Sequence, residues 1–155
     1  MENSFSTMPG HLLRRCHQIA VAIFLEDCAE LDLTPLQFAV LQALQGNGPQ
    51  DQATLGGATA MDRSTTALVV SKLEQRKLLR RKRSSRDQRS RIVTITATGK
   101  NLIRRALPMI EAAQQRIVAP LNAEESTRLL ELLEKLAQGN NAASRAPQKK
   151  RKRPL

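Results

Sequence analysis

Basic and hydroxylated side chains are concentrated between residues 61 and 96. An acid, a base and three hydroxyls come first: Asp62, Arg63, Ser64, Thr65 and Thr66. From Arg76 to Arg91 the chain then carries nine Lys or Arg residues and a single acid, Asp87. Because like charges at this density repel one another, a partner must supply the opposite charge, and nucleic acid phosphates are suited to do so.

Composition narrows the class of partner. The 155 residues fit one domain with a net charge of +11 and a pI near 10.8, which favours nucleic acid or an anionic membrane surface. No apolar run approaches the roughly 18 residues that span a bilayer, and no signal peptide is visible, so we expect a soluble, cytoplasmic protein. Three Phe and no Trp or Tyr argue against modules that stack single-stranded bases, which leaves duplex DNA.

The sequence offers no enzyme site. It contains no metal-ligand cluster, no phosphate-binding loop and no nucleophile with a base and an orienting group. The adjacent Cys16 and His17 point about 100° apart on a helix, which is poor geometry for a catalytic pair. We therefore expect no catalytic residues, no metal and no cofactor.

The basic segment is positioned by a helix-turn-helix pattern. Residues 51–58 are expected to form a short helix anchored by Leu55, although Gly56 and Gly57 each weaken it by about 1 kcal/mol relative to Ala. A turn over 58–61 follows, and Asp62 caps a helix that runs to about Lys77. Short helix, turn and second helix place that second helix in the DNA major groove. Strands over 79–83 and 91–95 then predict a two-stranded wing.

Amphipathic helices flank this segment. Periodic apolar residues predict a helix over 11–31, and Thr34 with Pro35 begins another that Gly46 to Pro49 ends. A third starts at Thr96 or Thr98, with a kink at Pro108, and Asn122 with Glu125 caps a last, leucine-rich helix. From Gly139 the pattern ends in a basic tail that is either a phosphate-contacting arm or an incidental solvated segment.

These elements resemble the MarR family of bacterial transcriptional regulators. The resemblance is carried by residues 33–38, 62–65, 73–74, 87–91, 94–96 and 99. It implies a mainly α fold with a small two-stranded wing, in a dimeric winged helix-turn-helix architecture. The divisions are a loose N-terminus (1–10), the family domain (11–138) and a disordered basic tail (139–155). Within the domain, 11–31 and 97–138 form the dimerisation helices and 34–96 the DNA-binding lobe. Two terminal regions rich in Leu and Ile agree with a homodimer.

The resemblance also assigns DNA contacts. The helix that starts at Asp62 enters the major groove, where Arg63, Ser64, Thr65 and Thr66 reach phosphates or base edges and Lys72 contacts the backbone. Thr66 and Val69 alternatively face the core. In the wing, Arg89 enters the minor groove with Asp87 as its orienting carboxylate, and Arg86 and Arg83 touch phosphate. For individual wing arginines the alternative is a solvated charge.

Family members commonly release DNA when a small aromatic acid binds near the dimer helices. Here Arg14, Arg15, His17 and His11 form an unusually polar start to such a helix, and they are either the effector-binding residues or ordinary surface charges. The implied protein represses aromatic-compound catabolic genes and leaves its palindromic operator when a benzoate, hydroxycinnamate or nicotinate-type acid binds. Two alternatives are a redox-sensing regulator through Cys16 and a nucleoid-type protein without sequence preference. Cys16 and Cys28 are about 18 Å apart on one helix and cannot pair within a chain; the simplest role for both is as small buried hydrophobes.

Overall fold

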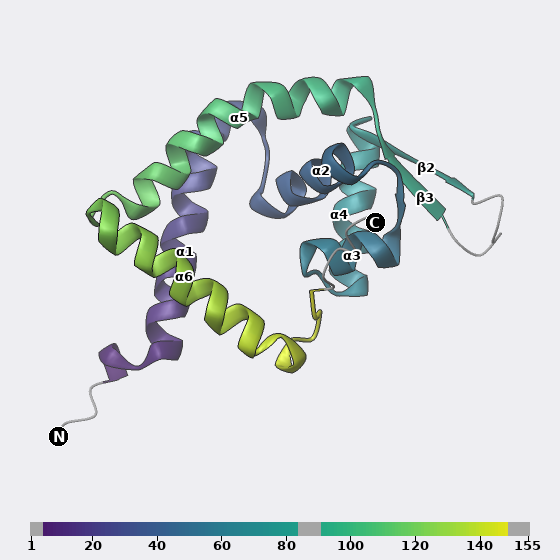
Figure 1. Cartoon of the computed structure of the whole chain (residues 1–155). Helices are drawn as coiled ribbons and strands as arrows, with labels where there is room; N and C mark the ends of the chain where they lie inside the picture. The colour runs from purple at the N-terminus through teal and green to yellow at the C-terminus, as the bar shows by residue number, and fades with distance from the viewer. Residues whose placement is uncertain (1–4, 84–90, 149–155) are drawn as a thin grey trace, which may run out of the picture.

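The computed structural model of the chain describes residues 5–83 and 91–148. A small α/β lobe holds the middle of the sequence, and the first and last long helices extend away from it (Figure 1). The lobe contains α2 (Pro35–Asn47), α3 (Gln52–Thr59), α4 (Arg63–Gln75) and the strands β1 (Gln50–Asp51), β2 (Leu79–Arg83) and β3 (Arg91–Ile95). None of the helices in the described part of the chain is long and apolar enough to cross a membrane.

The lobe helices begin where the sequence predicts. At the start of α2, the backbone N–H of Gln37 donates to Thr34 Oγ1 (3.2 Å), and the Gln37 amide oxygen accepts from the Thr34 N–H (3.1 Å). This reciprocal cap satisfies two backbone donors that a helix start otherwise leaves unpaired. Asp51 caps α3, and Asp62 caps α4. α4 ends two residues before the predicted Lys77, which has a left-handed φ of 58°.

Gly56, which weakens α3 as an isolated helix, is required by the packing of α3 on α4. A Cβ atom at Gly56 would lie 2.8 Å from Thr66 Oγ1 and 2.9 Å from the Met61 carbonyl oxygen. Both distances are shorter than real Cβ contacts, so any larger residue would push the two helices apart. Glycine at this position therefore lowers the helix propensity of α3 but lets α3 and α4 pack closely.

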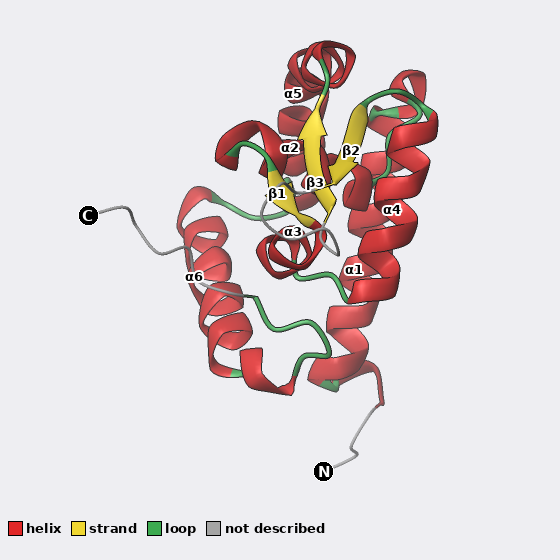
Figure 2. Cartoon of the chain, turned by 90° about the vertical axis from the view of Figure 1, so that its right-hand side faces the viewer, coloured by secondary structure: helices red, strands yellow, loops and turns green. Residues whose placement is uncertain are grey.

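The wing has three strands rather than the predicted two. β2 and β3 pair antiparallel with Leu79 opposite Ile95 and Arg83 opposite Arg91. The two-residue β1 adds to the other edge of β3, with Gln50 opposite Val93 (Figure 2). A strand of two residues is too short for an alternating pattern, so its pairing cannot be read from the sequence.

The hydrophobic core lies in the lobe and continues along one helix. Val40, Leu41, Leu55, Val70 and Val93 are fully buried where α2, α3, α4 and the sheet meet. The long helix α5 (Ala97–Val118), capped by Thr96, extends this core with Ile103, Ala106 and Ile110. It is continuous through Pro108, and its axis bends along its length (Figure 1).

The terminal helices leave much apolar surface uncovered. α1 (Pro9–Asp27) starts two residues before the predicted position and packs along α5, yet Phe24 is its only buried residue. α6 (Ala123–Gly139), capped by Asn122 with Glu125 as predicted, has no buried residue in the described chain. Its leucines at 130 and 136 are 62% and 52% exposed. Short 3-10 helices lie at Phe5–Thr7, Ala29–Leu31 and Asn141–Ala143.

The start of the basic tail lies against the lobe. The Gln148 side-chain amide donates to the Ala58 carbonyl (3.3 Å), and the Arg145 guanidinium lies 3.8 Å from Asp62 Oδ2. Residues 140–148 therefore run back to the turn between α3 and α4. The cations at 149–153 lie outside the described residues.

Candidate DNA-binding surface

The first turn of α4 is held by its own cap. Asp62 Oδ1 accepts from the Thr65 backbone N–H (2.8 Å) and from the Ser64 hydroxyl (2.9 Å). These hydrogen bonds, with a smaller contribution from Arg145, lower the pKa of Asp62 to about 2. Asp62 is therefore ionised at neutral pH and fixes the helix start. Next to it, Arg63 is exposed and has no ion-pair or hydrogen-bond partner in the described chain, so its guanidinium is available for DNA.

Thr66 does not reach DNA. Its side chain is 1% exposed, and its hydroxyl donates to the Asp62 carbonyl oxygen (2.8 Å). The prediction that Thr66 contacts phosphates or bases is wrong, and the alternative in which it faces the core is right. The reason is helical spacing, because Thr66 stands three, four and seven residues before Val69, Val70 and Leu73, which form the buried face of α4.

The outward face of α4 includes a large apolar residue, Leu68. Leu68 is 57% exposed. It stands three residues after Thr65 and four before Lys72, so the three share one side of the helix. Thr65 is half-buried and Lys72 is exposed. The signal that could have separated Leu68 from the core residues is its spacing. It stands two residues from both Thr66 and Val70, which places it about 200° around the helix from each of them.

The wing is joined to α4 by an ion pair. Glu74 on α4 accepts from the Arg81 backbone N–H through Oε1 (2.9 Å) and from Arg81 Nε through Oε2 (2.8 Å). The Arg81 guanidinium pairs with the same carboxylate, and this side-chain hydrogen bonding is the largest cause that lowers the pKa of Glu74. The wing strand is therefore held in a defined orientation relative to the helix. Sequence reasoning missed this pair.

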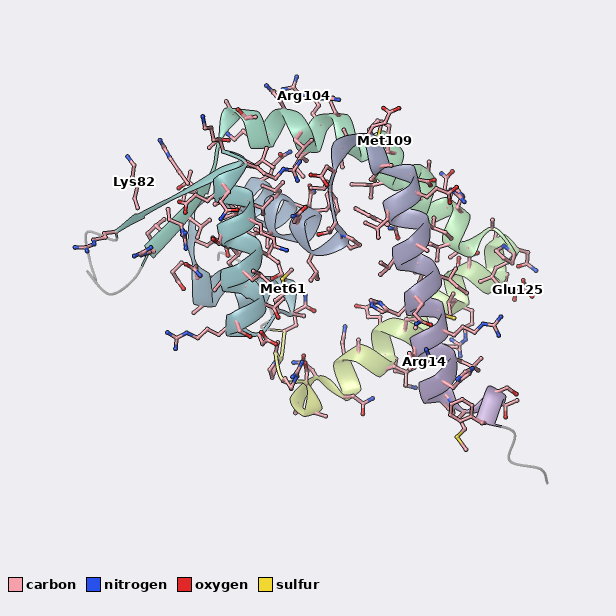
Figure 3. All side chains as sticks on the ribbon, turned by 180° about the vertical axis from the view of Figure 1, so that it is seen from behind. Arg14, Met61, Lys82, Arg104, Met109 and Glu125 are labelled. Carbon is pink, nitrogen blue, oxygen red and sulfur yellow. The ribbon has the colours of Figure 1, made fainter. Side chains whose placement is uncertain are left out.

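The basic end of the wing projects from the lobe. Lys82 and Arg83 are exposed at the end of β2, and Figure 3 shows Lys82 directed away from the body. The predicted DNA contacts Arg86, Asp87 and Arg89 lie outside the described residues.

A second contact connects the C-terminal end of α4 to an earlier part of the chain. The Arg76 guanidinium donates to the carbonyl oxygens of Leu31 (3.1 Å) and Asp32, in the segment between α1 and α2. It also lies 3.5 Å from the Gln37 amide oxygen. Arg76 thus fixes the C-terminal end of α4. Its partners are about forty residues distant in sequence, so no local pattern could indicate them.

The predicted effector residues lie on α1, away from the wing. Arg14, Arg15, His17 and His11 all belong to the N-terminal half of this helix, where Figure 3 labels Arg14. Arg14 Nη1 donates to Gln18 Oε1 (3.0 Å), and its Nη2 lies 3.5 Å from His11 Nδ1. Arg14 and Arg15 form no ion pair with the acids of the described chain. Arg15 and His17 are exposed, and none of the four residues lines the cavity between α6 and the lobe or the smaller one beside Lys100 and Arg104.

The two cysteines differ in environment. Both are free thiols, as their separation along α1 predicts. Cys28 is fully buried, and burial together with the nearby Asp27 raises the pKa of its thiol, which disfavours a reactive thiolate. Cys16 is exposed, so its expected role as a buried hydrophobe is wrong.

These features define the class of protein. A close helix-turn-helix, an outward helix face bearing a hydroxyl and a cation, and a basic antiparallel wing together form a winged helix-turn-helix DNA-binding lobe.

Comparison with known proteins gives the family. A sequence model of the MarR family matches residues 33–90. The chain is 35% identical over 134 residues to the HTH-type transcriptional repressor NicR of Pseudomonas putida, covering 86% of this chain and 85% of NicR. The chain therefore belongs to the MarR family, whose members are DNA-binding transcriptional regulators and not enzymes.

Two solved structures share the fold over most of the chain. One, described as showing how 6-hydroxynicotinic acid regulates DNA binding by Bordetella bronchiseptica BpsR, has a TM-score of 0.82 at 37% identity. It covers 86% of this chain and 95% of its own. The transcriptional repressor CouR bound to a 23-mer DNA duplex has a TM-score of 0.81 at 28% identity, with coverages of 88% and 97%.

Proposed function

We propose that this protein is a homodimeric repressor of aromatic-compound catabolic genes, released from a palindromic operator by a small aromatic carboxylate. Of the three acid types that the sequence suggests, nicotinate-type acids are favoured. The support is that DNA binding by the similar BpsR is regulated by 6-hydroxynicotinic acid, and that the related NicR is a transcriptional repressor.

The dimer is supported by the uncovered apolar faces. In the described part of the chain α6 has no fully buried residue, and it carries four exposed leucines. On α1, Leu12 and Leu13 are 45% and 48% exposed. Leaving this much aliphatic surface in water is unfavourable by about 25 cal/mol per Å². A second copy of the chain, which presents the same faces, covers them by a two-fold interface, and such a dimer reads a palindrome.

The single observation that carries the effector proposal is that the two arginines on α1 have no acid partner. Arg14 contacts only the neutral Gln18 and the His11 ring, and no acid of the described chain pairs with Arg14 or Arg15. A guanidinium without an acid partner is suited to bind a ligand carboxylate through two parallel hydrogen bonds. His17 and His11 supply ring nitrogens for a hydroxyl or pyridine nitrogen.

In this proposal the partner protomer supplies the second wall of the effector pocket, because the large cavity beside α6 does not suit an anionic acid. A cavity of about 1310 Å³ lies between α6 with the following segment and the α2–α3 edge of the lobe. Its lining is mostly amide and small side chains, with Glu134 as its charged group, and includes none of the four effector candidates. A negatively charged aromatic acid would meet repulsion there, so the arginine-bearing face of α1 is the better binding surface.

The test combines operator selection with release. Purified protein is used to select genomic fragments, and the bound site is footprinted. We expect one palindromic site, from which 6-hydroxynicotinate releases the protein at lower concentration than benzoate or 4-hydroxycinnamate. Arg14→Ala and Arg15→Ala should bind the site normally and require at least about tenfold more acid, since each loses a charged hydrogen-bonding partner. Arg128→Ala, which removes an exposed arginine from α6, is the matched control.

Three outcomes contradict the proposal. Uniform protection of DNA would indicate a nucleoid-type protein. Loss of binding with peroxide, prevented by Cys16→Ser, would indicate redox sensing. Release by none of the aromatic acids, at a site that the protein binds specifically, would refute the effector.

A further inference from the structure

Leu68 is an unusual residue for its place in the fold. Among the large apolar side chains of α3, α4, β2 and β3 that the structure describes, it alone is exposed. The other exposed large apolar side chains lie on or beside α1, at the start of α2, and on α6. Leu68 thus lies on a different element from the α1 and α6 residues that the proposed dimer covers. Leu68 therefore needs a different explanation.

The side chains around Leu68 indicate which kind of partner this face binds. The exposed and half-buried residues of this face are hydroxyl, amide or cationic, with Thr65, Ser71, Lys72 and Gln75 beside Leu68. The one acid within α4, Glu74, is paired with Arg81. Apart from Asp62 at the helix start, which is hydrogen-bonded within its own cap, this face presents no unpaired negative charge to a phosphate backbone, and the cationic Lys72 favours one. The surface is thus suited to the major groove, with an aliphatic group at its centre.

Only one apolar group is displayed by base edges in the major groove. Guanine, adenine and cytosine present hydrogen-bond donors and acceptors there, whereas thymine adds its C5-methyl group. A leucine side chain has no donor or acceptor, so the contact it can make with a base edge is an apolar one.

We propose that Leu68 contacts a thymine methyl group in each half of the operator and thereby selects thymine at that position. The inference rests on the proposed operator binding and is independent of the effector. Burying one methyl group corresponds to about a fourfold change in affinity, and two symmetric half-sites give roughly tenfold or more for the dimer.

The experiment replaces thymine by uracil in the selected operator, one symmetric pair of positions at a time. This change removes only the methyl group and leaves base pairing intact. With the full-length protein we expect roughly tenfold weaker binding at one pair of positions. Leu68→Ala should bind the thymine operator more weakly and lose the difference between thymine and uracil at that pair. Leu68→Met, which keeps an apolar contact, should retain much of it.

The matched control is Lys72→Ala on the same helix face. It should weaken binding to all duplexes by a similar factor, reduce the salt dependence, and preserve the uracil effect. Because Leu68 and Lys72 are exposed, circular dichroism should show both variants folded.

The proposal is overturned if the wild-type protein is indifferent to uracil at every position, if the selected site has no thymine, or if Leu68→Ala keeps the full uracil penalty. The scan uses no effector. A normal uracil effect without release by aromatic acids would therefore refute the proposed regulation alone, whereas specific binding without a uracil effect would refute only the role of Leu68.

Discussion

Glu74→Gln tests whether the wing is held by α4. In the structure one carboxylate accepts from the Arg81 backbone N–H at 2.9 Å and from Arg81 Nε at 2.8 Å, and it pairs with the guanidinium. Glutamine keeps the length and one acceptor oxygen. It removes the charge, and with it the attraction to the guanidinium.

The expected loss of stability in Glu74→Gln follows from the partial burial of the ion pair. A hydrogen bond to a charged group contributes about 1.5–3 kcal/mol. The Glu74 and Arg81 side chains are 34% and 21% exposed, so solvent screening reduces this toward about 1 kcal/mol. We expect the free energy of unfolding to fall by that amount. The operator affinity should fall about fivefold, because a loosened wing must be ordered on binding.

Acid titration identifies the charge as the cause. Hydrogen bonding from Arg81 lowers the pKa of Glu74 below its ordinary value of 4.5. The pair therefore stabilises the folded state fully above pH 4.5, and this contribution is lost as the pH falls through the lowered folded-state pKa. The glutamine variant should lose less stability on acidification than the wild type.

Urea unfolding at fixed protomer concentration measures these differences. Circular dichroism is the suitable signal because the chain has no Trp or Tyr. Glu131→Gln is the matched control: its pair with Arg128 has a similar distance of 2.9 Å but side chains 59% and 67% exposed, and it should change stability by less than about 0.5 kcal/mol. Equal behaviour of Glu74→Gln and wild type in urea, acid and operator titration would refute the reasoning.

Two further predictions concern the hinge between wing and α5 and the wing tip. Gly99→Ala should destabilise the protein by about 3 kcal/mol in urea, because a Cβ there would lie 2.1 Å from the Leu78 carbonyl oxygen. The control, Gly46→Ala, has open space around it and should instead stabilise the protein by about 0.5–1 kcal/mol. Unchanged stability of Gly99→Ala would show that this junction is not close-packed. Arg89→Ala should weaken operator binding roughly tenfold or more at fixed salt while sedimentation shows an unchanged dimer; near wild-type affinity would exclude the minor-groove role.

The ends of the helices follow from local sequence. Thr34, Asp62, Thr96 and Asn122 each cap the helix that the sequence predicts. A cap involves residues within three or four positions of one another, so its signal is contained in a short stretch of chain. The order of helices and wing strands, and through it the family, could therefore be recognised before any tertiary contact was known.

The side of each element that meets DNA or the core depends on packing. Thr66 and Leu68 are two residues apart, so helical spacing puts them on opposite sides of α4. The approach of α3 through Gly56 decides that the side carrying Thr66 is the buried one. The third wing strand likewise exists because β3 offers an edge to Gln50 and Asp51.

The sequence by itself determined a capped helix-turn-helix, a basic hairpin and apolar terminal helices, because periodicity and capping act over a few residues. Only the tertiary structure decided which α4 residues face outward, and how Glu74 and Arg76 fix that helix to the wing and to the α1–α2 segment. Those contacts join residues distant in the chain, and no local pattern encodes distances that arise only when separate elements pack together.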